Sequence, residues 1–109
     1  MHENNIKFVL AKEGDNIESI ARQFELGPWQ IRKYNDLHRG QPIASGDVVY
    51  LQPKRNKASG KKVHVAHKGE TMRDVSQLYG IKLKKLYDYN GMEEGAQPKQ
   101  GQKLRLRKP

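Results

Sequence analysis

The hydrophobic positions of the chain recur in two halves. Sliding the sequence against itself by 55 positions aligns the halves without a gap. The aligned apolar pairs are Ile17/Met72, Ile20/Val75, Phe24/Tyr79, Leu26/Ile81, Ile31/Leu86, Leu37/Met92 and Val49/Leu104. Turn residues match in identity, as Gly14 does with Gly69 and Gly46 with Gly101. A repeat of this kind indicates the tandem duplication of one small fold.

Each copy begins and ends with an apolar run that is too short for anything but a strand. These runs cover residues 8–11 and 48–51 in the first copy, and 63–66 and 103–106 in the second. Between them the apolar residues follow helical spacing, in two successive short segments. The order strand, helix, helix, strand predicts an α+β fold. In each copy we expect a two-stranded antiparallel sheet with both helices packed on one face.

Several residues mark the ends of the predicted helices. Asn16 and Thr71 are good N-caps for the first helix of each copy, and Pro28 suits the first turn of the next helix. Gly80 suits the left-handed residue that follows a helix, whereas Glu25 fits that position poorly. At the end of the second helix, we expect Asn35 and Asn90 to bond local backbone rather than a ligand. Their neighbours Tyr34 and Tyr89 are expected to be half-buried supports.

The repeat also predicts the domain organisation. The first module is expected over residues 6–53 and the second over residues 63–108. Residues 54–62 lack large apolar side chains, contain Ser and Gly, and carry several like charges. They are therefore expected to form a flexible basic linker.

Charge is distributed unevenly over the two halves. Residues 1–54 contain seven Lys/Arg and seven Asp/Glu, whereas residues 55–109 contain fourteen and five, so the net charge of +9 lies wholly in the second part. This excess indicates either an anionic partner or a solubilising surface. We expect Lys82, Lys84 and Lys85 to form a solvated helix face. Nucleic-acid binding is not expected, because aromatic residues are not interleaved with the basic ones.

Other features limit the cellular context. The chain has no cysteine, so neither disulfides nor thiolate ligands are available. No apolar run approaches the length of a membrane span, and residues 1–5 show no signal-peptide core. We expect a monomer. A place outside the cytoplasm, in the periplasm or cell envelope, would require a signal sequence upstream of Met1.

The sequence offers no catalytic constellation. Glycan hydrolysis by the usual route needs two carboxylates flanking one bond, and the acidic residues here lie on polar helix faces or in turns. No zinc, phosphate-loop or nucleophile motif is present. His64 and His67 are close in sequence, but in a strand they would point to opposite faces. We therefore expect no metal ligands, no cofactor and no enzymatic activity. The single tryptophan, Trp29, is assigned to packing or an interface rather than to sugar stacking.

Two sets of segments, in the same order in both halves, carry a family resemblance. In the first half they are Lys12 to Asn16, Ile20-Ala21, Tyr34 to Leu37 and Ser45 to Val48; in the second they are Lys68 to Met72, Val75-Ser76, Tyr89 to Met92 and Gln100 to Leu104. In this order the chain resembles a pair of LysM (lysin motif) modules. It is also similar to the C-terminal part of bacterial cell-wall glucosaminidases, in which LysM copies follow a catalytic domain.

The resemblance implies a βααβ fold whose loops bind N-acetylglucosamine polymers such as peptidoglycan or chitin. The implied groove lies between the first strand–helix loop and the second helix–strand loop. Mapped onto this sequence, it comprises Gly14, Asp15, Asn16 and Ile17 facing Leu37, His38, Pro42 and Ile43 in the first module, and Gly69, Glu70, Thr71 and Met72 facing Met92, Glu93, Gln97 and Pro98 in the second. The implied role is to target an attached enzyme, such as a glucosaminidase, to the cell wall.

The chemistry of an acetamido sugar fits such loops. The sugar presents an amide donor, an amide acceptor, a methyl group and an apolar ring face, so exposed backbone groups and a nearby apolar side chain such as Ile17 or Met72 suit it. Two linked modules on a repetitive polymer would gain avidity. Two alternatives stay open: a protein-docking or spacer module, and a basic domain that binds an anionic polymer.

Overall fold

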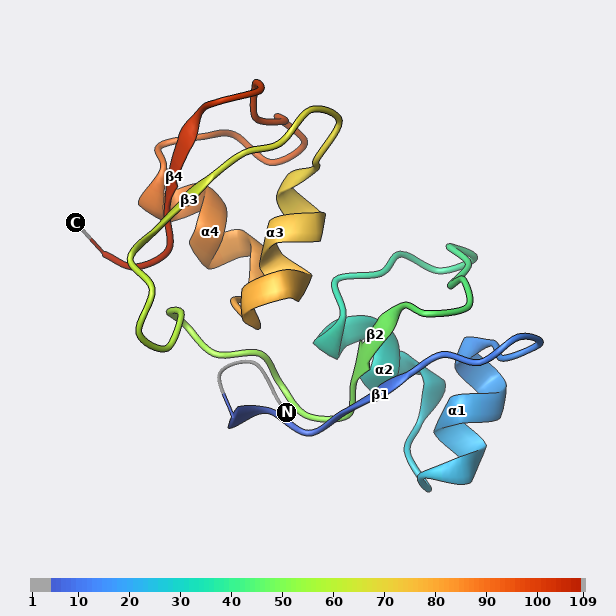
Figure 1. Ribbon diagram of the computed structural model, residues 1–109. Coiled ribbons are helices and arrows are strands. Elements are labelled where there is room, and N and C mark those ends of the chain that lie inside the picture. Colours follow the sequence, from blue (N-terminus) through green and yellow to red (C-terminus); the bar gives the residue numbers. More distant parts are fainter. Residues whose placement is uncertain (1–4, 109) are drawn as a thin grey trace. The chain divides into compact units, whose positions relative to one another are not determined.

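The computed structural model describes residues 5–108, which form two compact units that divide between Lys54 and Arg55. Residues 1–4, part of the segment in which no signal-peptide core is expected, lie outside the described residues. The elements run in the order β1 (Phe8–Leu10), α1 (Ile17–Gln23), α2 (Pro28–Tyr34), β2 (Val48–Tyr50), β3 (Val63–Val65), α3 (Met72–Tyr79), α4 (Leu83–Tyr89) and β4 (Lys103–Arg105) (Figure 1). None of the helices within residues 5–108 is both long and apolar enough to cross a membrane.

In the first module, β1 and β2 form an antiparallel pair in which Phe8 lies opposite Tyr50 and Leu10 opposite Val48. Helices α1 and α2 pack against one another and close the core. The buried core residues are Ala11, Ile17, Ile20, Ala21, Ile31, Leu37, Val49 and Leu51. The strands are one residue shorter than the apolar runs suggested, and the predicted βααβ arrangement is confirmed.

The second module repeats this design. Strands β3 and β4 pair antiparallel, with His64 opposite Leu104, and α3 and α4 pack beside them (Figure 1). The core consists of Ala58, Ala66, Met72, Val75, Ile81, Leu86, Tyr87, Leu104 and Leu106. Apolar residues at equivalent positions of the repeat therefore fill equivalent cores.

The predicted N-caps are confirmed. The side-chain oxygen of Asn16 accepts a hydrogen bond from the backbone N–H of Ser19 at 2.7 Å, and Thr71 does the same for Asp74 at 3.0 Å. In each case the backbone N–H of the cap residue donates to the side chain of its partner, Ser19 or Asp74, which completes a capping box. Pro28 lies in the first turn of α2, where its missing N–H removes no helical bond. These caps fix where the first loop of each module ends.

The residues after α1 and α3 adopt the same left-handed geometry. Gly80 has φ of 66° and Glu25, near the end of α1, has φ of 57°. Only glycine takes this geometry without a steric cost from Cβ. The fold therefore imposes the left-handed turn in the first module despite the side chain of Glu25.

Asn35 joins the end of α2 to strand β2. Its Nδ2 donates to the carbonyl of Ile31 at 2.7 Å and to that of Tyr50 at 3.0 Å, and its Oδ1 accepts from the N–H of Tyr50 at 2.7 Å. Asn90 makes the same three bonds in the second module, at 2.9, 2.9 and 2.7 Å. The predicted local bond is confirmed at the carbonyls of Ile31 and Leu86, and the other two bonds of each asparagine reach the last strand of its module, 15 residues away.

The segment expected as a linker, residues 54–62, is partly built into the second module. The backbone of Arg55 bonds both Gly80 and Lys82 at 2.8 Å, and the N–H of Ala58 donates to the carbonyl of Leu106 at 3.0 Å. Ala58 is 2% exposed and belongs to the core. Backbone groups and one small side chain make these contacts, so composition alone gave no sign of them.

Candidate glycan-binding loops

The first loop of the first module presents backbone rather than side chains. Gly14 has φ of 86°, and a Cβ placed on it would meet nothing within 4 Å, so the turn is open to solvent. The carboxylate of Asp15 accepts from the N–H of Lys12 at 2.9 Å, and Asn16 caps α1. Ile17 is only 4% exposed. The side chains of Asp15, Asn16 and Ile17 thus hold the loop and its core. The N–H groups of Asp15 and Asn16 are bonded within the loop, so among the N–H groups of these three residues only that of Ile17 has no bond to another described residue.

The second loop of the first module combines core and exposed residues. Leu37 is buried, Ile43 is half-buried against the core, and His38 and Pro42 are exposed. The side chain of Gln41 accepts from the N–H of His38 at 3.1 Å and stiffens the turn. Ile43 and Pro42 are therefore the apolar groups of this loop that a sugar could reach.

The first loop of the second module is tied down more firmly. Gly69 has φ of 77° and is open above its Cα. Oε1 of Glu70 accepts from the N–H of His67 at 3.0 Å, and Thr71 caps α3. Met72 is fully buried. As in the first module, the predicted side chains mostly support the loop.

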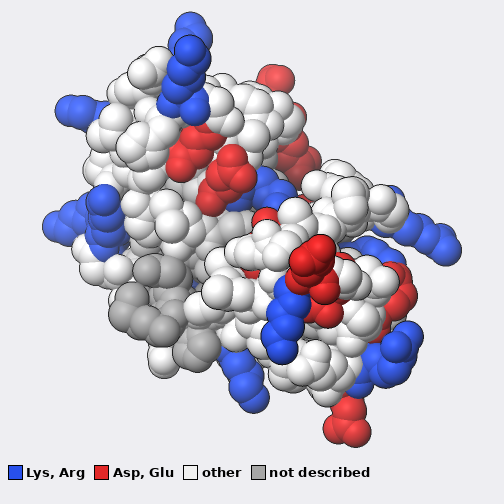
Figure 2. Space-filling view, turned by 45° about the vertical axis from the view of Figure 1, so that its right-hand side comes forward, with Lys and Arg blue, Asp and Glu red and all other residues white. Residues whose placement is uncertain are grey.

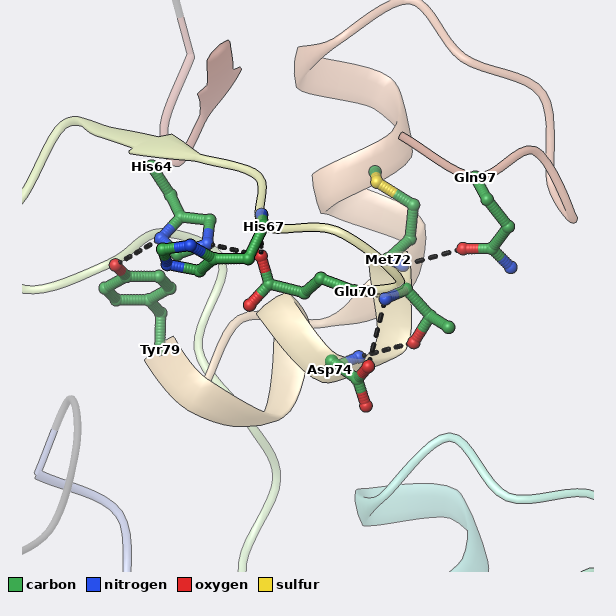
Figure 3. Close-up of polar contacts among 8 residues, drawn as sticks. His64, His67, Glu70, Met72, Asp74, Tyr79 and Gln97 are labelled. Carbon is green, nitrogen blue, oxygen red and sulfur yellow. Dashed lines mark hydrogen bonds and ion pairs between the residues drawn. The ribbon is translucent and has the colours of Figure 1, made fainter. Parts of the chain in front are cut away.

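The second loop of this module reaches the first one directly. The backbone N–H of Met72 donates to Oε1 of Gln97 at 2.8 Å (Figure 3). Met92 and Pro98 are half-buried, and Glu93 is exposed. The two predicted loops are therefore brought together in the second module by a side-chain carboxamide.

The first module lacks this bridge. Gln97 corresponds to Pro42 in the repeat, and Met72 corresponds to Ile17. Proline has no amide side chain, and among residues 5–108 we find no hydrogen-bond partner for the N–H of Ile17. The same backbone donor is thus occupied in one module and open in the other.

A polar network lies beside the first loop of the second module. The imidazole of His64 bonds the hydroxyl of Tyr79 through Nδ1 at 2.7 Å and Oε1 of Glu70 through Nε2 at 2.8 Å (Figure 3). Burial acts to raise the pKa of Glu70, but hydrogen bonds from the His67 backbone and the His64 ring, with the attraction of both imidazoles, leave this pKa below its ordinary value.

The expectation that His64 and His67 point to opposite faces is wrong. Their ring centroids are 5.6 Å apart. Strand β3 ends at Val65, so His67 lies in the following turn and strand alternation no longer governs its direction.

Trp29 is exposed, at 65%, and borders an open hollow of about 590 Å³ in the first module. The hollow is lined by Glu18, Pro28, Trp29, Arg32, Lys33, Leu37 and Arg39. Arg32 and Glu18 form an ion pair at 2.7 Å on its wall. The indole is therefore available to a ligand or partner rather than packed in the core.

Three lysines of the second half lie at or in helix α4. Lys82, Lys84 and Lys85 are all exposed, in agreement with a solvated helix face. On the face drawn in Figure 2, Lys and Arg side chains protrude at separate places with acidic residues between them. On this face, basic side chains interspersed with acidic ones are typical of a solubilising surface.

The fold is a pair of small βααβ modules, each with two loops that lie at the same end of its sheet and helices. The LysM domain family model matches residues 11–52 and 64–107, and the chain belongs to this family. LysM domains are binding modules rather than catalytic ones, and they generally bind N-acetylglucosamine-containing glycans such as peptidoglycan.

Longer proteins contain similar regions. "Autolysin" of Enterococcus faecalis (strain ATCC 700802 / V583) is 28% identical over 90 residues, which cover 74% of this chain and 12% of that protein. Among solved structures, the spore cortex-lytic enzyme SleL of Bacillus cereus is 24% identical with a TM-score of 0.41, over 94% of this chain and 23% of that one. SleL of Bacillus megaterium QM B1551 is 19% identical with the same TM-score, over 95% and 23%.

Proposed function

We propose that this chain binds peptidoglycan or a related N-acetylglucosamine polymer through the paired loops of its modules. The observation that supports this best is the hydrogen bond from the Met72 N–H to Oε1 of Gln97. The carboxamide of glutamine has the same donor and acceptor groups as the acetamido substituent of the sugar. A backbone donor between the two loops thus already accommodates a group of the ligand's chemistry.

In the first module the equivalent donor, the N–H of Ile17, is the group that would meet the acetamido carbonyl. The side chain of Ile17 is too deeply buried to cover the methyl group, since it is 4% exposed. Ile43 and Pro42 on the opposite loop are the accessible apolar groups, and Pro98 and Met92 hold this role in the second module. Uncharged recognition of this kind requires no reactive group.

The first module is the better binding site in this proposal. A ligand there meets an open N–H, whereas a ligand at the second module must first displace the carboxamide of Gln97. Breaking one such hydrogen bond costs about 0.5–1.5 kcal/mol, or roughly twofold to tenfold in affinity. On a repetitive polymer even a weaker second module adds avidity.

Targeting of an attached enzyme to the cell wall extends the proposal. It is supported by the match to a much longer protein with the name Autolysin, of which this chain spans 12%. A cell-envelope location follows from the same proposal. Removal of residues 5–108 from the full-length protein should then lower its retention on purified walls without abolishing activity on a soluble substrate.

The direct test is a titration of the ¹⁵N-labelled chain with N-acetylglucosamine oligomers, together with retention on purified peptidoglycan at low and high salt. We expect amide shifts at Gly14 to Ile17 and around Pro42, and retention that changes little with salt. A chain held by anionic polymer would lose affinity steeply as salt rises. Unmoved loop amides would refute glycan binding through these loops.

A further inference from the structure

Three potential metal ligands meet at the first loop of the second module. His64, His67 and Glu70, called here the His–Glu cluster, each offer one ligand atom, and these atoms lie within 4.8 Å of one another. His64 comes from strand β3, and the other two come from the turn between β3 and α3 (Figure 3). The cluster thus spans a strand and the loop that follows it.

The ring of His64 is held in a fixed orientation. It is 5% exposed, Nδ1 bonds the hydroxyl of Tyr79, and Nε2 faces Oε1 of Glu70. Metal-binding histidines commonly use one ring nitrogen as ligand while an oxygen partner orients the other. Tyr79 stands in this orienting position, so Nε2 is the nitrogen directed into the cluster.

Glu70 and His67 retain free ligand capacity. The hydrogen bonds to Glu70 reach Oε1, and within residues 5–108 we find none to its Oε2. The imidazole of His67 is exposed and has no hydrogen bond to a described residue. Oε2 of Glu70 and the ring of His67 are therefore available as ligands, and their use leaves the backbone bond from the Glu70 N–H to the His67 carbonyl in place.

The fold does not require these residues. In the first module the equivalent positions hold Val9, Lys12, Asp15 and Phe24, of which Val9 and Phe24 pack against the core. That module forms the same strand, turn and helix without a buried imidazole. A buried polar network generally stabilises less than the apolar packing that it replaces. Packing alone therefore gives no reason for the cluster.

We propose that the His–Glu cluster is a binding site for a divalent transition metal, with Zn²⁺ as the best match. Two imidazoles and one carboxylate are a ligand set that Zn²⁺ accepts, and a water molecule or another exogenous ligand completes four-coordination. Tetrahedral bonds of ~2.0–2.2 Å place ligand atoms roughly 3.3–3.6 Å apart. The wider separations in the cluster, of up to 4.8 Å, must therefore shrink, whereas Nε2 of His64 and Oε1 of Glu70, which are 2.8 Å apart, must separate slightly as the metal replaces their hydrogen bond. The exposed ring of His67 can supply this movement.

The metal would fasten the glycan-binding loop to the sheet. Glu70 lies between Gly69 and Thr71, and His64 lies within β3. Coordination by both would restrict the loop that presents the N–H of Met72. Metal binding itself does not depend on glycan binding and can be measured without a glycan.

The test uses the whole 109-residue chain, first freed of metal with a chelator, and titrates it with ZnCl₂ by calorimetry and with CoCl₂ by visible absorption. We expect one equivalent to bind, tetrahedral Co²⁺ bands to appear, and the ring resonances of His64 and His67 to shift. Binding without these histidine shifts, or no binding at all, would overturn the proposal.

Variants taken from the first module provide the controls. His64→Val and His67→Lys should each weaken Zn²⁺ binding by more than the ~10–100-fold typical of losing an orienting partner, and Tyr79→Phe should weaken it by about tenfold. His38→Ala removes an exposed histidine of the first module, far from the cluster in sequence, and should leave the affinity for Zn²⁺ unchanged when no glycan is present. Amide spectra establish that each variant is folded. Folded His64→Val and His67→Lys proteins with unchanged affinity would contradict the proposal.

Discussion

The backbone N–H of Met72 donates to Oε1 of Gln97 across 2.8 Å, which closes the space between the two loops of the second module. In the first module Pro42 stands where Gln97 does, and the N–H of Ile17 has no hydrogen-bond partner in the described part of the chain, residues 5–108. The residue at this position thus determines whether the same backbone donor meets a side chain of the opposite loop. If the loops bind acetamido sugars, residues 42 and 97 set which module binds more tightly.

Exchanging these two residues should exchange the properties of the modules. Gln97→Pro removes the competing carboxamide and should raise the glycan affinity of the second module by roughly twofold to tenfold, the equivalent of one hydrogen bond. Pro42→Gln should lower the affinity of the first module by a similar factor. Amide shifts measured separately in each module during titration with chitooligosaccharides give both affinities.

A change in backbone freedom could imitate the first effect, because proline also restricts its neighbours. Gln97→Ala therefore serves as the control, since it removes the carboxamide alone and should produce the same gain. Equal affinities of the wild-type and Gln97→Ala second modules would show that Gln97 does not compete with the ligand.

Asn35 and Asn90 permit a matched test of how much the helix–sheet bridge contributes to stability. Asn35 is 1% exposed and satisfies both backbone groups of the buried Tyr50, so Asn35→Ala should lower the free energy of unfolding of the first module by about 2–3 kcal/mol. Asn90 makes the same bonds nearer to solvent, where water can replace them, and Asn90→Ala should cost about 1 kcal/mol. Urea titrations followed by amide resonances compare the modules, with Trp29 fluorescence as a second probe of the first. Equal losses would argue against burial as the cause.

Much of the fold could be predicted because each local signal pointed to the same arrangement. The caps at Asn16 and Thr71, the spacing of Ile17, Ile20 and Phe24, and the short terminal strands agree between the two copies. Because the sequence is repeated, each apolar position is supported by its equivalent in the other copy, and these shared positions predict most of the buried residues. The left-handed residue at Glu25 was harder to predict, since tertiary packing there overrides a side-chain preference.

The contacts around the loops could not be predicted in the same way. The bond between Met72 and Gln97 joins residues 25 positions apart, and no periodicity specifies it. Strand alternation predicts opposite faces for His64 and His67, but β3 ends at Val65, so alternation does not set the direction of His67. The burial of Ala58 could not be predicted, because one small residue within a basic segment belongs to no hydrophobic pattern.

The left-handed position at Glu25 offers a route to a more stable first module. A non-glycine residue at φ of 57° carries a steric cost of about 1–2 kcal/mol, which Glu25→Gly removes. Glycine also raises the conformational entropy of the unfolded chain, and this offsets part of the gain in stability. We expect a net gain of about 0.5–1 kcal/mol in the unfolding free energy of the first module. Gly80→Ala, at φ of 66° in the second module, should lose about 1 kcal/mol. Denaturant midpoints measured for each module show whether each substitution raises or lowers the free energy of unfolding. Destabilisation of the first module by Glu25→Gly would exclude this account of the turn.

The boundary of the second module can be tested with two adjacent substitutions. Ala58 is 2% exposed within the core and Ser59 is exposed, although both lie in the segment whose composition suggested a linker. Ala58→Asp places an unpaired carboxylate in the core and should lower the stability of the second module by about 3 kcal/mol. Ser59→Asp adds the same charge one residue later and should change it by less than about 0.5 kcal/mol. Amide-resolved urea titration of both variants measures the difference. If Ala58→Asp proved as mild as Ser59→Asp, the second module would begin after residue 58, and the packing of the Arg55–Ala58 backbone would contribute little to its stability.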